Sequence, residues 1–155
     1  MPAFGIRFDL RNPGLSNCTM AERVDAALEM GAWADRLGAR LIVLAEHHGS
    51  EDGYLPSPLT LGAAMAARTR TATVQLFLIA SFYDPMRLAE DLAVLDLIGK
   101  GRIDVNLVAG YVPGEFAMFG VPMSERPARM TEMVRTLKAA WTGEPFEYRG
   151  TTVRV

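Results

Sequence analysis

The sequence predicts an α/β fold: a parallel sheet built from four strand–helix units and followed by a β-hairpin. Short apolar runs alternate four times with segments of helical periodicity, in units of roughly 30–40 residues, and alternation of this kind is typical of parallel sheets with right-handed crossovers. The last ten residues instead alternate around Arg149-Gly150, a pattern that indicates two short antiparallel strands joined by a tight turn.

The first unit has clear start and stop signals. A strand is expected over Phe4–Leu10, and residues 12–14, Asn-Pro-Gly, end it. Thr19 and Glu22 have the spacing of a capping box, so a helix should begin there. Apolar residues then recur at helical spacing until Gly38, which we expect to end the helix.

The second unit contains the most apolar stretches. Arg40–Ala45 is expected to form a strand buried on both faces. After a loop over 49–56, Ser57 and Pro58 have the residue types of an N-cap and a first helical position. The following helix has almost no polar face before Arg68. A helix that is apolar nearly all round is buried on more than one side, which in a small chain favours contact with another subunit.

The remaining units follow the same rules. The expected elements are a strand over Thr73–Ala80, a helix over Met86–Ile98 opened by Asp84-Pro85 and ended by Gly99, a strand over Ile103–Ala109, a loop, and a helix from about Ser124 to Trp141 ended by Gly143.

Composition narrows the class of protein. A chain of 155 residues fits one domain, here 1–155. Its net charge of −2 with mixed signs gives no basic surface for nucleic acid or an anionic membrane. It has no apolar run of the ~18 residues that cross a bilayer, and no signal-peptide pattern at its start. A single cysteine allows no internal disulfide. These features predict a soluble, cytoplasmic protein.

Two architectures fit the alternation: a four-stranded doubly wound sheet, or half of a (β/α)8 barrel, because a complete barrel needs ~250 residues. Periodicity does not choose between them. A doubly wound regulatory domain of the response-regulator type would need an acidic cluster at the strand ends, and only Asp9 fits, so we rank that alternative last.

The candidate site directly follows the second strand. Glu46, His47 and His48 come straight after the apolar run, and these two histidines are the only ones in the chain. An imidazole at the end of a buried parallel strand can exchange protons near neutral pH, although a purely structural histidine is the simpler alternative. Adjacent residues in an extended chain point to opposite sides, which argues against a shared metal ion.

The sequence contains five short motifs in a fixed order, the first of which is the candidate site itself: E-H-H, Y-x-P-S-P, D-P-x-R-x-A-E-D, G-K-G-R and G-Y-x-x-x-E-F-x-x-F-G. Together, over Phe4 to Val155, they resemble the bacterial luciferase-like flavin-dependent monooxygenases. The resemblance implies a parallel sheet like the first half of a TIM barrel, four βα units, plus the C-terminal hairpin. It also implies reduced flavin, either FMN or a deazaflavin, bound at the carboxyl ends of the strands, where it reacts with oxygen or exchanges a hydride.

The resemblance also implies roles for individual residues around the strand ends. His47 would be the acid–base residue beside the flavin, and Glu46 would either orient it or cap the loop. The Leu76–Phe77 bond matches a cis peptide under the flavin ring, whereas the residues alone favour an ordinary buried strand. His48 would meet Glu90 of a second copy across a homodimer formed by the second and third helices.

The end of the fourth strand departs from the family pattern. Ala109 stands where the family often has an arginine near the flavin, before Gly110 and Tyr111, so one anion contact is missing. Arg126 and Arg129, at the start of the next helix, could reach a phosphate, but solvated arginines are the more ordinary interpretation.

We therefore expect a flavin-dependent oxidoreductase, most simply a monooxygenase, acting on a small molecule that the sequence does not identify. Family members are about twice as long, so a truncated or decayed half-barrel that dimerises and binds no flavin is the alternative. Either way, open sheet edges and an uncovered apolar face predict self-association.

Overall fold

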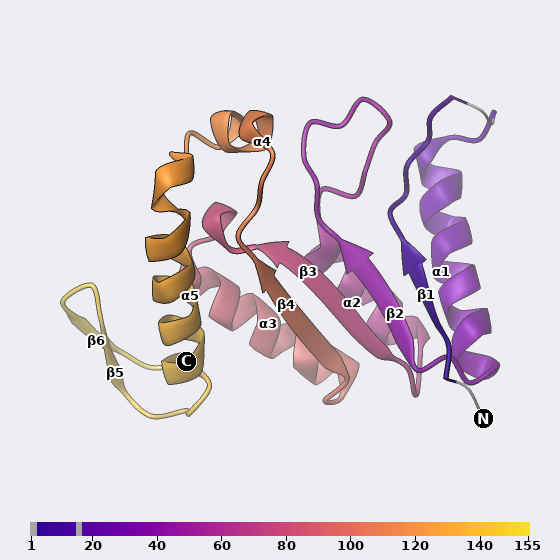
Figure 1. Cartoon of the computed structure of the whole chain (residues 1–155). Helices are drawn as coiled ribbons and strands as arrows, with labels where there is room; N and C mark the ends of the chain where they lie inside the picture. The colour runs from indigo at the N-terminus through magenta and orange to yellow at the C-terminus, as the bar shows by residue number, and fades with distance from the viewer. Residues whose placement is uncertain (1–2, 15–16) are drawn as a thin grey trace. The chain divides into compact units, whose positions relative to one another are not determined.

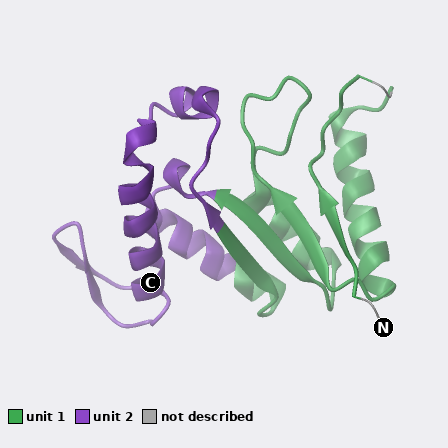
Figure 2. Ribbon diagram, in the orientation of Figure 1, with its two compact units in different colours: residues 1–78, 95–106 green, residues 79–94, 107–155 purple. Residues whose placement is uncertain are grey.

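The computed structural model describes residues 3–14 and 17–155. The chain forms two compact units, shown in two colours in Figure 2. Unit 1 comprises residues 1–78 and 95–106, and unit 2 comprises residues 79–94 and 107–155.

The central feature is a parallel sheet of four strands in the order β1-β2-β3-β4 (Figure 1). The strands are β1 (Gly5–Phe8), β2 (Leu41–Ala45), β3 (Thr73–Ile79) and β4 (Ile103–Val108). Each begins or ends within three residues of the expected position. A spatial order that follows the chain order is that of consecutive barrel strands, whereas a doubly wound sheet reverses direction at its switch point. The topology thus confirms the half-barrel alternative.

The helices of unit 1 begin where their capping residues predict. In α1 (Met20–Arg36), the backbone N–H of Glu22 donates to the Thr19 hydroxyl at 3.2 Å, and the Glu22 carboxylate accepts from the Thr19 N–H at 2.7 Å. In α2 (Pro58–Arg68), Ser57 is the N-cap residue, but its hydroxyl lies 2.8 Å from the Thr60 hydroxyl and makes no cap bond to the backbone.

Strand β2 is buried on one face only, so the expectation that both faces are buried is wrong. Ile42 and Leu44 are fully buried, whereas Leu41 and Val43, which point the other way, are half-buried. The reason is that α1 and α2 lie on the same side of the sheet (Figure 1). Burial on the second face would require additional chain.

Helix α2 packs on the sheet along one side. A Cβ at Gly62 would lie 2.9 Å from the Leu76 side chain, so glycine permits this close approach. The opposite side of α2 is open, with Ala63 half-buried and Ala67 exposed. The second apolar side of α2 that the sequence predicted is therefore present, and no other part of the same chain covers it among the residues described.

The turn between α2 and β3 is held from two directions by charged side chains, of which Asp35 is buried and Arg102 half-buried. Asp35, in the last turn of α1 and 8% exposed, accepts hydrogen bonds from three successive backbone N–H groups, those of Arg70, Thr71 and Ala72, at 2.6–3.0 Å. Burial alone would raise the pKa of Asp35, but these bonds and one from the Thr71 hydroxyl lower it from 3.8 to about 2.

The carbonyl groups of the same turn are held by Arg102. Its guanidinium donates to the backbone oxygens of Ala66, Thr69 and Ala72 at 2.9–3.1 Å. The arginine of the G-K-G-R motif is thus a structural residue, which satisfies the carboxyl end of α2 and the start of β3.

Unit 2 contains the helices and hairpin that follow β3 and β4. Its elements are η1 (Ala80–Phe82), most of α3 (Pro85–Gly99), α4 (Pro113–Met118), η2 (Met123–Glu125), α5 (Arg126–Ala140), β5 (Phe146–Tyr148) and β6 (Thr151–Val153). The expectation of a plain loop after the fourth strand is wrong, because α4 forms there. Pro113 at its first position is the one local start signal.

The hairpin confirms the turn predicted from Arg149-Gly150. Both residues have positive φ, 48° and 79°, as a two-residue type I′ turn requires. The Arg149 guanidinium also pairs with Asp84 and with Glu132 of α5, each at 2.9 Å.

Asp84 has a second role at the start of α3. Its carboxylate accepts from the backbone N–H groups of Met86 and Arg87 at 3.0 and 3.2 Å, as a capping residue does. Burial would raise the pKa of Asp84, but these bonds and the charge of Arg149 outweigh it and lower the pKa.

None of the helices described is both long enough and apolar enough to cross a membrane.

We predict that Asp35→Asn lowers the free energy of unfolding at pH 7 by about 2 kcal/mol, because the pKa of Asp35 in the folded protein, about 2, lies below its ordinary value of 3.8. Because the folded pKa is depressed, this contribution is complete above pH 4 and is lost as the pH falls towards 2. Urea unfolding at pH 7, 4 and 3 should therefore show the variant and the wild type converging with acid. Asp25→Asn, on the exposed side of α1, is the matched control, and an equally small loss in both variants at pH 7 would contradict this role.

Candidate active site

The candidate site begins where β2 leaves the sheet. The backbone N–H of Glu46 donates to the carbonyl of Phe77 at 3.2 Å, which extends the pairing with β3 by one residue. The N–H of His47 then donates to the carbonyl of Leu55 at 3.1 Å, which ties the strand end to its returning loop. Backbone hydrogen bonds on both sides thus fix Glu46 and His47, the first two of the three candidate residues.

Glu46 and His48 point to the same side and bind each other. Their side chains are 2% and 10% exposed, and His48 Nε2 lies 2.8 Å from Glu46 Oε1. Residues two apart in an extended chain share a face. Glu46 thus has a hydrogen-bond partner that the sequence analysis did not anticipate, the second histidine. A nearly buried carboxylate of this kind fixes the orientation of the imidazole that it contacts.

His47 contacts a different set of residues. Its ring packs edge-on against Tyr54, with centroids 4.5 Å apart and an interplanar angle of 77°. The Tyr54 hydroxyl in turn accepts a hydrogen bond of 2.7 Å from the Arg7 guanidinium. The two adjacent histidines therefore belong to two separate groups of side chains, as the alternation along an extended chain predicts.

The end of β3 lies beside β2 in unit 1. Leu76 is fully buried on the helix-covered face, and Phe77 is half-buried on the other face, opposite Ala45 in the register. The peptide bonds between described residues are all trans, the Leu76–Phe77 bond included. The cis bond implied by the resemblance is therefore not present, and the ordinary strand favoured by the residues alone is what forms.

The end of β4 in unit 2 carries the other predicted cofactor residues. Ala109 is exposed and offers only a methyl group, and Tyr111 is 72% exposed. Gly110 has a φ of 77°, and a Cβ there would come within 2.9 Å of the side chains of Phe116 and Ile79. Glycine is therefore required at this position for both conformation and space.

The two arginines after β4 differ in what they bind. Arg126 donates to the carbonyls of Gly110 and Met123 at 2.8 and 2.9 Å, so its guanidinium supports the backbone of unit 2. Arg129 pairs through Nε with Glu125 at 2.9 Å.

Sequence reasoning missed Arg7 and Tyr54. Arg7 stands alone as a charged residue among the apolar positions of β1, and Tyr54 opens the Y-x-P-S-P motif. Those local features mark both positions as unusual, but their contact joins residues 47 apart in the chain and has no local signature.

The chain is similar to known proteins over nearly its whole length. The family model described as luciferase-like monooxygenase matches residues 4–155. The oxygenase component of a flavin-dependent trigonelline monooxygenase from Acinetobacter baylyi is 30% identical over 139 residues, which cover 85% of this chain and 37% of the relative. An FMNH2-dependent dimethylsulfone monooxygenase from Pseudomonas putida is 34% identical over 161 residues, which cover 94% of this chain and 44% of the relative.

Solved structures give the same answer for the fold. The monooxygenase RslO1 from Streptomyces bottropensis superposes with a TM-score of 0.86 at 32% identity, covering 98% of this chain and 47% of that one. The oxygenating constituent of 3,6-diketocamphane monooxygenase from Pseudomonas putida, solved with FMN, superposes with a TM-score of 0.84 at 23% identity, covering 97% and 42%.

The chain spans less than half the length of these relatives, between 37% and 47%. Within that span the match is nearly complete, because the family model covers residues 4–155. On these grounds the chain belongs to the luciferase-like monooxygenase family.

Proposed function

We propose that this chain contributes the acid–base part of a flavin-dependent monooxygenase site, with His47 as the group that exchanges protons and FMN as the cofactor. The observation that carries the proposal is the placement of His47 at the carboxyl end of β2, held against Tyr54. Relatives named as FMNH2-dependent and flavin-dependent monooxygenases support the choice of cofactor.

The residues at the strand ends of unit 1 suit a flat, mostly apolar ring. Phe77 and the His47–Tyr54 pair offer aromatic surface, and each is only partly buried by its own chain. Reduced flavin, when bound, would supply the electrons that activation of oxygen needs. The sequence has Ala109 where the family often has an arginine near the flavin, so we expect this chain to bind the ring system better than the phosphate.

Arg7 and Tyr54 act in this proposal as positioning residues. The hydrogen bond between them restrains the phenol, and the edge-on contact restrains the imidazole of His47. A general acid–base residue must be held within hydrogen-bond reach of the proton that it moves. Tyr54 therefore limits the rotation that would carry the His47 ring away from its working position.

We predict that His47→Ala slows the reoxidation of bound, photoreduced FMN by about a hundredfold, the usual contribution of a positioned acid–base group. FMN affinity, from quenching of flavin fluorescence, should change by less than about threefold, since one contact to the ring is lost. Stopped-flow absorbance after mixing with oxygen, across pH 6 to 9, measures the rate and its pH profile. An equal loss of affinity and rate would assign His47 a structural role.

Two further variants separate chemistry from positioning. Tyr54→Phe keeps the ring contact and removes the hydroxyl that Arg7 binds, so it should produce a smaller loss of rate and a shifted pH profile. His48→Gln changes the neighbouring imidazole and should leave the rate near that of the wild type. A wild-type protein that quenches neither FMN nor deazaflavin fluorescence would contradict the proposed function and favour the non-catalytic alternative.

We further propose that the chain forms a homodimer through α2 and α3. On α3, Val94, Leu97 and Ile98 are 58%, 78% and 41% exposed, a spacing that forms one apolar stripe. The open side of α2 is likewise apolar. Surfaces of this kind on a water-soluble chain mark association sites.

The same proposal gives His48 a second partner. Within one chain, His48 binds Glu46, and the Glu90 side chain is 52% exposed. In the proposed dimer, Glu90 of the other copy would approach the Glu46–His48 pair, so that one imidazole would lie between two carboxylates.

We predict that Leu97→Glu converts the dimer to a monomer, because it places a charge within the apolar stripe. Size-exclusion chromatography with light scattering measures the mass directly. Leu37→Glu is the matched control, since Leu37 is a comparably exposed leucine, 57%, at the end of α1. A monomeric wild-type protein, or a Leu97→Glu variant that stays dimeric, would rule out this interface.

A further inference from the structure

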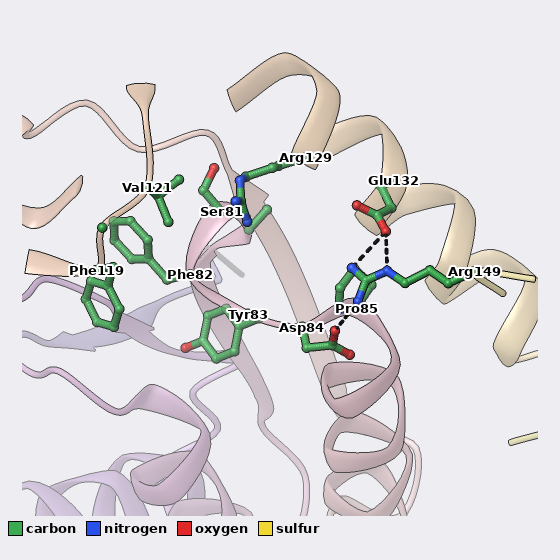
Figure 3. Close-up of a pocket in the computed structure, with 12 residues that line it drawn as sticks. Ser81, Phe82, Tyr83, Asp84, Pro85, Phe119, Val121, Arg129, Glu132 and Arg149 are labelled. Carbon is green, nitrogen blue, oxygen red and sulfur yellow. Dashed lines mark hydrogen bonds and ion pairs between the residues drawn. The ribbon is translucent and has the colours of Figure 1, made fainter. Parts of the chain in front are cut away.

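Unit 2 contains a cavity of its own, with a volume of about 410 Å³ (Figure 3). It lies among η1, the segment that follows α4, and α5. Ligand sites for small organic molecules typically have volumes of about 300–1,000 Å³. The cavity can therefore hold a molecule with one ring.

Ser81 supplies an unsatisfied hydroxyl to this cavity. The residue is 2% exposed and lines the cavity, and its Oγ has no hydrogen-bond partner among the residues that the structure describes. Buried hydroxyl groups are nearly always hydrogen-bonded, so one without a protein partner is a place where a ligand or an ordered water binds.

Arg129 supplies a positively charged guanidinium whose two terminal nitrogens are available to a ligand. Its Nε binds Glu125, an exposed residue that does not line the cavity. Its two terminal nitrogens make no hydrogen bond within the part of the chain that the structure describes. In Figure 3 the Arg129 guanidinium extends from α5 towards Ser81. A guanidinium and a hydroxyl on one wall make a suitable site for the two oxygens of a carboxylate.

The other charged residues that line the cavity form one cluster around Arg149. Arg149 is held between Asp84 and Glu132 at 2.9 Å each, so its charge is already neutralised. This cluster has two carboxylates for one guanidinium, so Arg149 offers no free positive charge to an anion. Arg129 is thus the cation of this cavity that a ligand would meet.

Aromatic side chains form the remaining wall. Phe82 and Phe119 stack with centroids 4.4 Å apart and an interplanar angle of 13°, and Tyr83 and Val121 continue the surface. A wall of this kind favours a flat apolar body. Combined with Ser81 and Arg129, it favours a molecule with a flat ring at one end and a negative group at the other.

We propose that this cavity binds a small aromatic carboxylate, with the carboxylate on Arg129 and Ser81 and the ring against Phe119 and Tyr83. None of these four residues takes part in the proton exchange proposed for His47. The cavity is therefore a second ligand site, and ligand binding to it can be tested independently of the proposed flavin chemistry.

Isothermal titration calorimetry of the full chain with benzoate tests this site. Benzamide has the ring without the charge, and acetate has the charge without the ring. We expect saturable benzoate binding, and binding of benzamide and acetate at least about tenfold weaker, because each lacks one of the two recognised features. Equal binding of benzoate and benzamide, or no saturable binding of benzoate up to about 10 mM, would overturn the proposal.

Variants assign the binding to this cavity. Arg129→Gln should weaken benzoate binding about tenfold or more, and Ser81→Ala by a smaller factor, since a charged hydrogen bond contributes more than a neutral one. Arg135→Gln, an exposed position on α5 that does not line the cavity, is the matched control. Thermal unfolding checks that each variant folds. Benzoate binding that is unchanged in a folded Arg129→Gln protein would exclude this site.

Discussion

The sheet of unit 1 depends on how one turn is held. In the short segment between α2 and β3, the carboxylate of Asp35 accepts hydrogen bonds from the backbone N–H groups. The guanidinium of Arg102 donates hydrogen bonds to backbone carbonyl groups of the same segment. The backbone of Arg102 also accepts from the N–H of Val74, so β3 is positioned from both neighbours at once. The position at which β3 begins determines which of its residues lie at its carboxyl end, and therefore where Phe77 lies. These hydrogen bonds lie at the amino end of β3, and in barrels of this type the site is built at the carboxyl ends of the strands.

The positions of most helices, strands and turns could be predicted from residues close together in the sequence. The features that could not be predicted depend on contacts between distant parts of the chain. Thr19 with Glu22, Asp84 before Pro85, and Arg149-Gly150 each act within a few residues, and the structure confirms all three. Periodicity alone left two sheet topologies open, because it describes single strands and not their order. The one-sided burial of β2 depends on what covers the sheet, which no pattern inside the strand records. Helix α4, with six residues, is too short to show a helical period.

The candidate site divides in the same way. Its location after β2 and the separation of His47 from His48 follow from residue order and from the two-residue period of extended chain. The side chains that surround His47 could not be predicted in this way, because the hydrogen bond between Arg7 and Tyr54 joins residues 47 positions apart. Glu46 shows how a near neighbour can mislead: it lies next to His47 in sequence, yet it hydrogen-bonds the residue beyond.

The C-terminal hairpin has a consequence for the cooperativity of unit 2. Its turn residue Arg149 is anchored to Asp84, the same carboxylate that caps the first turn of α3. Opening the hairpin would therefore weaken the start of a helix more than fifty residues earlier in the chain, and fraying of that helix would release the hairpin. Local openings of the two elements are energetically linked, as in a cooperative folding unit. A hairpin that looks like a peripheral extension thus belongs thermodynamically to the body of its unit.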